Sequence, residues 1–215
     1  MRTRLGLLIV GLALVGAGVA GCSSTTSGTS GAVQDDAATS PSGVTASSCA
    51  EGGACAIGDI GPGNGIVFYV ASTPFSSAAP CGTSCTYLEA QTSDAGLVPY
   101  CVGPGATASI PNSNAAAIGA GFQNTMSITA TSECSSGAGF TAMAPNGGLT
   151  DWYLPSLSEG MALYENYAAV GGLEGTYWTS TQANTKQASY VSDTTNTGLT
   201  DPKSLDMNVR AIRAF

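Results

Sequence analysis

The nine residues from 151 to 159 place an extended segment, a proline and a helix start next to each other. Pro155 restricts the residue before it to extended backbone geometry. Ser156 and Glu159 have the spacing of a capping box, in which each side chain accepts a hydrogen bond from the other residue's backbone N–H. The sequence therefore predicts that a strand end is followed at once by a helix that begins near Leu157.

Apolar side chains continue at helical spacing after this cap, at Leu157, Met161, Tyr164 and Ala168. Gly171 and Gly172 are a typical helix stop, so the helix is predicted to end near residue 169. Its apolar stripe must pack against another part of the chain.

The first 21 residues have the pattern of a secretion signal. Arg2 and Arg4 precede an apolar run, and small residues lead to Cys22 in the tetrapeptide Val-Ala-Gly-Cys, which resembles a lipobox. Residues 1–21 are therefore predicted to be a lipoprotein signal peptide, and Cys22 to carry a lipid that anchors the protein to a membrane. A transmembrane anchor is the alternative, but the apolar run is short for about 30 Å of hydrocarbon.

Residues 22–48 comprise this cysteine and a segment rich in Ser, Thr, Gly and Ala. The segment has no aromatic residue, and its only charges are Asp35 and Asp36, so it cannot form a core. It is predicted to be a disordered linker. Residues 49–215 then have the length of one domain.

Seven cysteines are present, and six remain when the lipidation site is set aside. An even number in an exported chain predicts disulfides. A zinc site is disfavoured because the chain has no histidine. Spacing leaves several pairings open and favours Cys49 with Cys55, Cys81 with Cys85, and Cys101 with Cys134.

Charge and composition exclude several functions. The chain has 6 Lys and Arg against 14 Asp and Glu, and loss of Arg2 and Arg4 with the signal would change the net charge from −8 to −10. Such a protein should repel nucleic acid, so no nucleic-acid partner is expected. Without histidine, the usual nucleophilic triads are excluded as well.

Two other sequence patterns also occur in enzymes, and neither identifies a catalytic site here. Residues 58–65 are rich in glycine but lead into a strand, so they predict a tight turn and not a phosphate-binding loop. Paired carboxylates could hydrolyse glycans, and no pair is singled out among the candidates. We therefore predict that the protein is not an enzyme, with a glycan-active enzyme as the alternative. The carboxylate candidates are Asp151, Glu159, Glu165 and Glu174.

Residues 151–159 resemble the C-terminal domain of bacterial collagen-like adhesins and allied bacterial surface lipoproteins. Other segments resemble the same family in the same order, at 58–70, 87–90, 118–125, 177–181 and 209–215. The resemblance implies a C-type-lectin-like fold of the α+β class. This fold would have a twisted, mainly antiparallel sheet, helices near residues 122–134 and 157–169, and long loops.

The alternation of residues 177–182 predicts a strand with two distinct faces. Trp152 and Trp178 are expected to be core residues, because large aromatic side chains contribute strongly to burial. Arg210 and Arg213 are three residues apart, and one of them is expected to point inward and to pair with a carboxylate such as Asp151.

The region from Gln182 to Asn208 is polar, with interspersed aromatic and basic residues, which is typical of recognition surfaces. An ordinary solvated loop is the alternative. No metal or cofactor is predicted, because the motifs of calcium-dependent lectins are absent. Asp193, Asn196, Asp201, Asp206 and Asn208 nevertheless leave a calcium site open. The predicted ligand-binding residues are Gln182, Asn184, Lys186, Ser189 and Tyr190.

Together these features predict a lipid-anchored, extracytoplasmic binding or adhesion module without catalysis, at the outer membrane or cell surface. Its partner would be an extracellular glycan or protein. A structural lipoprotein of the cell envelope is the alternative.

Overall fold

The computed structural model describes residues 47–215. The predicted signal peptide, the lipidation site at Cys22 and nearly all of the predicted linker lie outside these residues. Within 47–215, no helix is long and apolar enough to cross a membrane. In chain order the elements are η1 (Cys49–Glu51), β1 (Ile66–Phe75), β2 (Cys85–Ala90), β3 (Gly96–Pro99), η2 (Pro104–Ala106), α1 (Gly121–Ala130), α2 (Ala138–Ala142), α3 (Leu157–Glu165), α4 (Tyr167–Val170), β4 (Thr176–Gln182), β5 (Gln187–Ser192), β6 (Thr195–Pro202), β7 (Asp206–Val209) and β8 (Ile212–Ala214).

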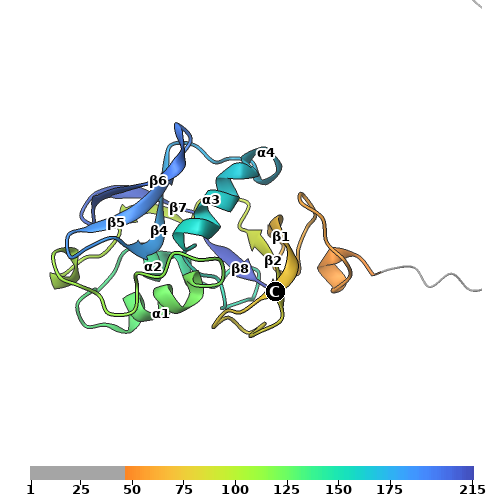
Figure 1. Cartoon of the computed structure of the whole chain (residues 1–215), viewed down its shortest axis with the longest axis horizontal. Coiled ribbons are helices and arrows are strands. Elements are labelled where there is room, and N and C mark those ends of the chain that lie inside the picture. Colours follow the sequence, from red (N-terminus) through yellow and green to blue (C-terminus); the bar gives the residue numbers. More distant parts are fainter. Residues whose placement is uncertain (1–46) are drawn as a thin grey trace, which may run out of the picture. The chain divides into compact units, whose positions relative to one another are not determined.

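The strands form two sheets (Figure 1). One contains three strands in the order β1-β2-β8, and the other contains five in the order β3-β7-β4-β5-β6. All strand pairs are antiparallel except β4 with β7. Because β7 and β8 follow one another directly but belong to different sheets, the last ten residues join the two sheets. The protein is therefore a mixed α and β structure with mainly antiparallel sheets.

The helix predicted after the proline is present. α3 begins at Leu157, and Ser156 and Glu159 form the capping box, with the Glu159 backbone N–H donating to Ser156 Oγ. The helix ends at Glu165 and not near residue 169. Asn166 breaks it, because its backbone N–H turns back to Leu163 and its side chain donates to the carbonyl of Ala162. The short helix α4 then follows.

The other helical prediction was too long. α1 ends at Ala130, and the next residue, Thr131, is extended with ψ of 143°. The chain then runs to Cys134, whose disulfide ties it to the segment after β3. A further short helix, α2, follows at Ala138 and was not predicted.

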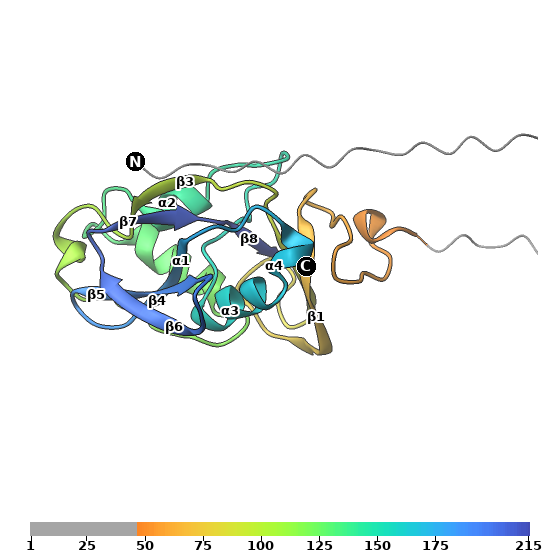
Figure 2. The same ribbon diagram turned by 90° about the horizontal axis from the view of Figure 1, so that it is seen from above.

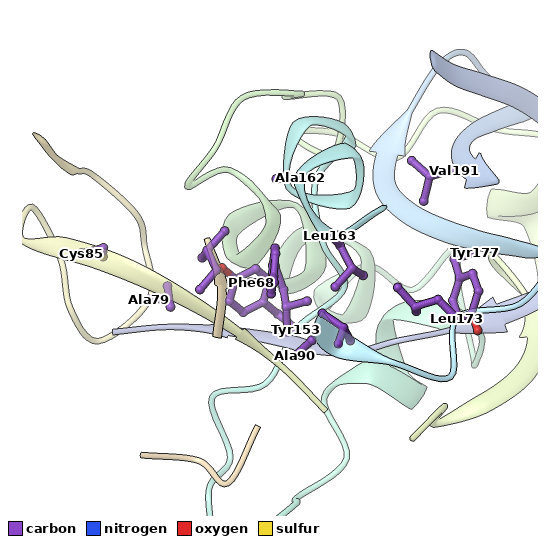
Figure 3. Packing of buried hydrophobic residues seen from close by; sticks show 14 residues of the cluster. Phe68, Ala79, Cys85, Ala90, Tyr153, Ala162, Leu163, Leu173, Tyr177 and Val191 are labelled. Carbon is purple, nitrogen blue, oxygen red and sulfur yellow. The ribbon is translucent and has the colours of Figure 1, made fainter. Parts of the chain in front are cut away.

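Two clusters of buried apolar side chains form the core. In the first, α3 lies between the sheets and contacts both β1 and β6 (Figure 2). Figure 3 shows Leu163 of this helix between Tyr153 on one side and Tyr177 on the other. In the second cluster, Trp152 and Trp178 are fully buried. Both tryptophans are thus core residues, as predicted.

The structure contains the three disulfides that spacing favoured. They join Cys49 to Cys55, Cys81 to Cys85, and Cys101 to Cys134. The first two close short loops, whereas the third closes a loop of 33 residues. Long loops leave an unfolded chain with more entropy to lose, so the third disulfide should contribute most to stability.

Both C-terminal arginines are paired with carboxylates. Arg213 Nε lies 2.8 Å from Asp151, which confirms the expected partner, and its Nη1 lies 3.0 Å from Glu89. Arg210 is fully buried and pairs with Asp94 at 2.8 Å. Arg210 is thus the arginine that points inward, whereas the Arg213 side chain is 14% exposed.

Candidate binding surface

The five residues predicted to bind ligand do not form one surface. Gln182 and Ser189 are 7% and 4% exposed. Gln182 Oε1 accepts hydrogen bonds from the Ile110 backbone at 2.8 Å and from Lys203 Nζ at 2.6 Å. Ser189 lies on β5, where its carbonyl accepts a bond from Thr179 Oγ1. These two residues are buried and bonded to other parts of the protein, so the prediction that they are surface contacts is wrong.

The other three differ in exposure and position. Asn184 is exposed, but its Oδ1 accepts the backbone N–H groups of Lys186 and Gln187 and so forms the turn between β4 and β5. Lys186 is exposed on the same turn. Tyr190 is half-buried and packs edge-on against Trp178, with ring centroids 6.4 Å apart. Of the five predicted residues, only Asn184 and Lys186 on the exposed turn remain as candidates for a free surface.

Lys203 occupies a cage of oxygen atoms beneath this turn. Its side chain is fully buried, and its Nζ donates to the carbonyls of Gly105, Ala108 and Thr185 and to Gln182 Oε1, at 2.6 to 3.1 Å. Burial lowers the pKa of Lys203 to about 8, so the ammonium form still predominates at neutral pH. The ammonium thus holds together three segments that are distant in sequence. Sequence reasoning missed this role, because a lysine in a polar loop normally lies in solvent.

The glycine-rich turn at residues 58–65 binds a carboxylate of the same chain, that of Glu89. The backbone N–H groups of Gly63 and Gly65 donate to the Glu89 carboxylate at 2.9 to 3.0 Å. A Cβ at position 63 would lie 2.7 Å from this carboxylate and 2.8 Å from Trp152, so only glycine fits. The turn is therefore already filled, which agrees with its prediction as structural.

The four carboxylates considered for catalysis have different environments. Asp151 is paired with Arg213, whereas Glu165 and Glu174 are exposed. Glu159 is fully buried and accepts backbone N–H groups from Gly119 at 2.8 Å and from Ser156 at 2.7 Å. Burial raises its pKa to about 7, while these hydrogen bonds limit the rise. Its acid form is thus accessible near neutral pH, but the group faces the core and not a cavity.

Glu159 makes stability depend on pH. Its pKa is about 7 in the folded protein against an ordinary 4.5, so the folded state binds more protons between these values. The free energy of unfolding should therefore rise as pH falls from 7 to 4.5, by up to about 3 kcal/mol. Glu159→Gln should remove this dependence, as measured by urea unfolding at several pH values. Glu165→Gln, at the exposed end of the same helix, is the control. Equal pH profiles of wild type and Glu159→Gln would contradict the prediction.

A groove opens between the end of α3, helix α4 and the turn from β5 to β6. We call it the tyrosine groove, and its volume is about 560 Å³. Asn166 creates it by ending α3, because the chain then turns and leaves Tyr167 60% exposed. The lining residues are Tyr164, Glu165, Tyr167, Leu173, Ser192 and Asp193.

Internal contacts keep this groove in shape. Tyr164 Oη donates to the carbonyl of Gly175 at 2.8 Å, and the Gly175 N–H donates to Asp193 at 3.3 Å. Buried Arg210 donates to the carbonyls of Gly171 and Gly172, just before Leu173. The groove is therefore preformed. The sequence feature that could have indicated this groove is the pair Tyr164 and Tyr167 near the end of the helix. The groove was missed because helical spacing assigned Tyr164 to the apolar stripe.

The tyrosine groove includes part of the polar region between Gln182 and Asn208, but at the other end of β5 from Asn184 and Lys186. Ser192 and Asp193 line it, whereas Lys186 precedes the first residue of the strand. At about 3.3 Å per residue, the six steps from Lys186 to Ser192 span roughly 20 Å. The groove and the exposed turn are thus separate candidate surfaces.

The three aspartates that left calcium open lie on different elements. Asp193 lies at the turn after β5, Asp201 lies on β6, and Asp206 begins β7. Asn208 donates its side-chain amide to the carbonyl of Glu174. Within residues 47–215, no group of three or more His, Cys, Asp or Glu side chains could hold a metal ion.

No family model matches the chain, and no curated protein matches it. Among solved structures, it is similar to a fimbrial protein from Bacteroides ovatus ATCC 8483, with a TM-score of 0.43 and 16% sequence identity. The match covers 70% of this chain and 44% of the fimbrial protein, so this chain corresponds to less than half of that protein's length.

Proposed function

We propose that this chain is a lipid-anchored, extracytoplasmic binding module without catalysis, with a C-type-lectin-like domain. The tyrosine groove is the observation that carries this proposal. It is preformed, its volume lies within the range of about 300 to 1,000 Å³ that is typical of ligand sites, and it combines aromatic, apolar and carboxylate groups. By contrast, the buried charged side chains elsewhere are occupied by internal partners.

Other features support an extracytoplasmic location. The three disulfides suit an oxidising compartment. The signal pattern before Cys22 and the ordered motifs that resemble collagen-like adhesins agree with a surface lipoprotein. The absence of histidine and the internal use of Asp151 and Glu159 argue against catalysis.

The test is a glycan and protein binding array with the purified, oxidised protein, with and without calcium. We expect a ligand whose capture is lost in the double variant Glu165→Gln, Tyr167→Ala. Lys186→Ala, on the exposed turn at the other end of β5, should capture it normally. Glu165 and Tyr167 are both exposed, so the double variant should have nearly the same melting temperature as the wild type. Capture that depends on Lys186 and not on the groove would move the site to the turn, and no capture at all would contradict the proposal.

A further inference from the structure

The tyrosine groove has more negative than positive charge around it. The part of the chain that is described has four cationic side chains. Lys203 is buried, and Arg210 and Arg213 are paired with carboxylates. The fourth, Lys186, lies roughly 20 Å away at the far end of β5.

The two carboxylates of the groove are incompletely neutralised. Asp193 accepts bonds from two neutral donors, the Gly175 N–H at 3.3 Å and the Ser192 hydroxyl at 3.5 Å. The carboxylate of Glu165 has no hydrogen-bond or ion-pair partner among the described residues 47–215. A ligand for this groove should therefore bring a positive charge.

The aromatic residues of the groove favour the same kind of ligand. Tyr167 exposes most of its ring, and Tyr164 is half-buried beside it. The electron-rich faces of tyrosine rings attract cations, and this attraction grows when water is partly excluded. Leu173 adds an apolar surface that is 9% exposed. Alkyl carbon next to a positive charge would satisfy both the carboxylates and the apolar surface.

We infer that the tyrosine groove binds an organic ammonium group, with the rings of Tyr164 and Tyr167 against the cation and Glu165 and Asp193 as its counter-charges. This inference rests on the proposed binding function and specifies its ligand. A lysine side chain of a partner polypeptide fits this chemistry, because its N–H groups can donate to both carboxylates, whereas a quaternary ammonium such as choline has no N–H to donate. A multiply charged anion is excluded by the two carboxylates.

Titration of the purified, oxidised protein with small probes tests this inference. Nα-acetyl-lysine amide represents the lysine side chain, choline is the quaternary comparison, and 3,3-dimethylbutanol is the neutral analogue of choline. We expect saturable binding of Nα-acetyl-lysine amide by NMR or calorimetry, with weakening as salt increases. Tighter binding of choline than of Nα-acetyl-lysine amide would overturn the assignment to lysine.

Substitutions distinguish binding in the groove from a general attraction of cations to the negatively charged protein. Glu165→Gln and Tyr167→Ala should each weaken the binding of the ammonium probe by about 10-fold, within the range for desolvated cation–π and ion pairs. Asp206→Asn removes one exposed carboxylate outside the groove and should have no effect. Equal binding of the neutral analogue, or equal weakening by Asp206→Asn, would overturn the inference.

The array and the titration can fail separately. A ligand whose capture depends on the groove, without binding of either ammonium probe, would refute the ammonium assignment and leave the binding function in place. Ammonium binding without any captured macromolecule would support the groove chemistry and count against the binding module.

Discussion

Replacing Glu89 by alanine is expected to lower the free energy of unfolding by about 3 to 5 kcal/mol. Glu89 is fully buried and receives two backbone N–H groups of the glycine-rich turn and one N–H of Arg213. Its loss would leave these buried donors without an acceptor, and each unsatisfied group costs about 1 to 3 kcal/mol. Urea unfolding with the disulfides intact measures the effect.

Two further variants test this explanation. Glu89→Gln keeps one acceptor oxygen and should be less destabilising than alanine. Glu174→Ala removes an exposed glutamate and should change stability by no more than about 0.5 kcal/mol. If Glu89→Ala and Glu174→Ala had equal effects, the turn would not depend on its internal anion.

Lys203→Met should destabilise the protein to a similar extent, by about 3 to 5 kcal/mol. Methionine is also long and unbranched, but it cannot donate to the four oxygen atoms of the cage. These oxygens would remain buried without a donor. Because the ammonium joins the segment near Gly105 to the turn at Thr185, both segments should exchange amide hydrogens faster.

Lys186→Met is the matched control, since this lysine is exposed on the same turn. It should leave both the unfolding free energy and the exchange near Gly105 unchanged. Normal stability of Lys203→Met would show that the oxygens find other partners, which would refute the role of the cage.

Local patterns predicted local structure well. The capping box of Ser156 and Glu159 correctly predicted the start of α3, because its hydrogen bonds connect residues three apart. The burial of both tryptophans followed from their size. The end of α3 was not predicted, because Asn166 interrupts a pattern whose apolar members continue to Ala168.

The polar residues of β4 and β5 were harder to interpret. Alternation correctly predicted a strand at residues 177–182, but its two faces are not distinct, because both are buried. Thr181 and Gln182 hydrogen-bond backbone groups of the long loops at Ala115 and Ile110. Irregular backbone that is buried needs such partners. A polar strand in a loop-rich protein can therefore belong to the interior, and its composition alone resembles that of a surface.

The sequence by itself determined the features whose signals are local: the helix cap, the strand after the glycine-rich turn and the excess of negative charge. Only the tertiary structure decided which charged groups are internal. Glu89, Lys203 and Arg210 have partners that lie between 18 and 124 positions away. It also placed Tyr167 and Asp193 in the lining of one groove. The physical reason is that burial and pairing depend on which segments meet in space, and no short pattern records this.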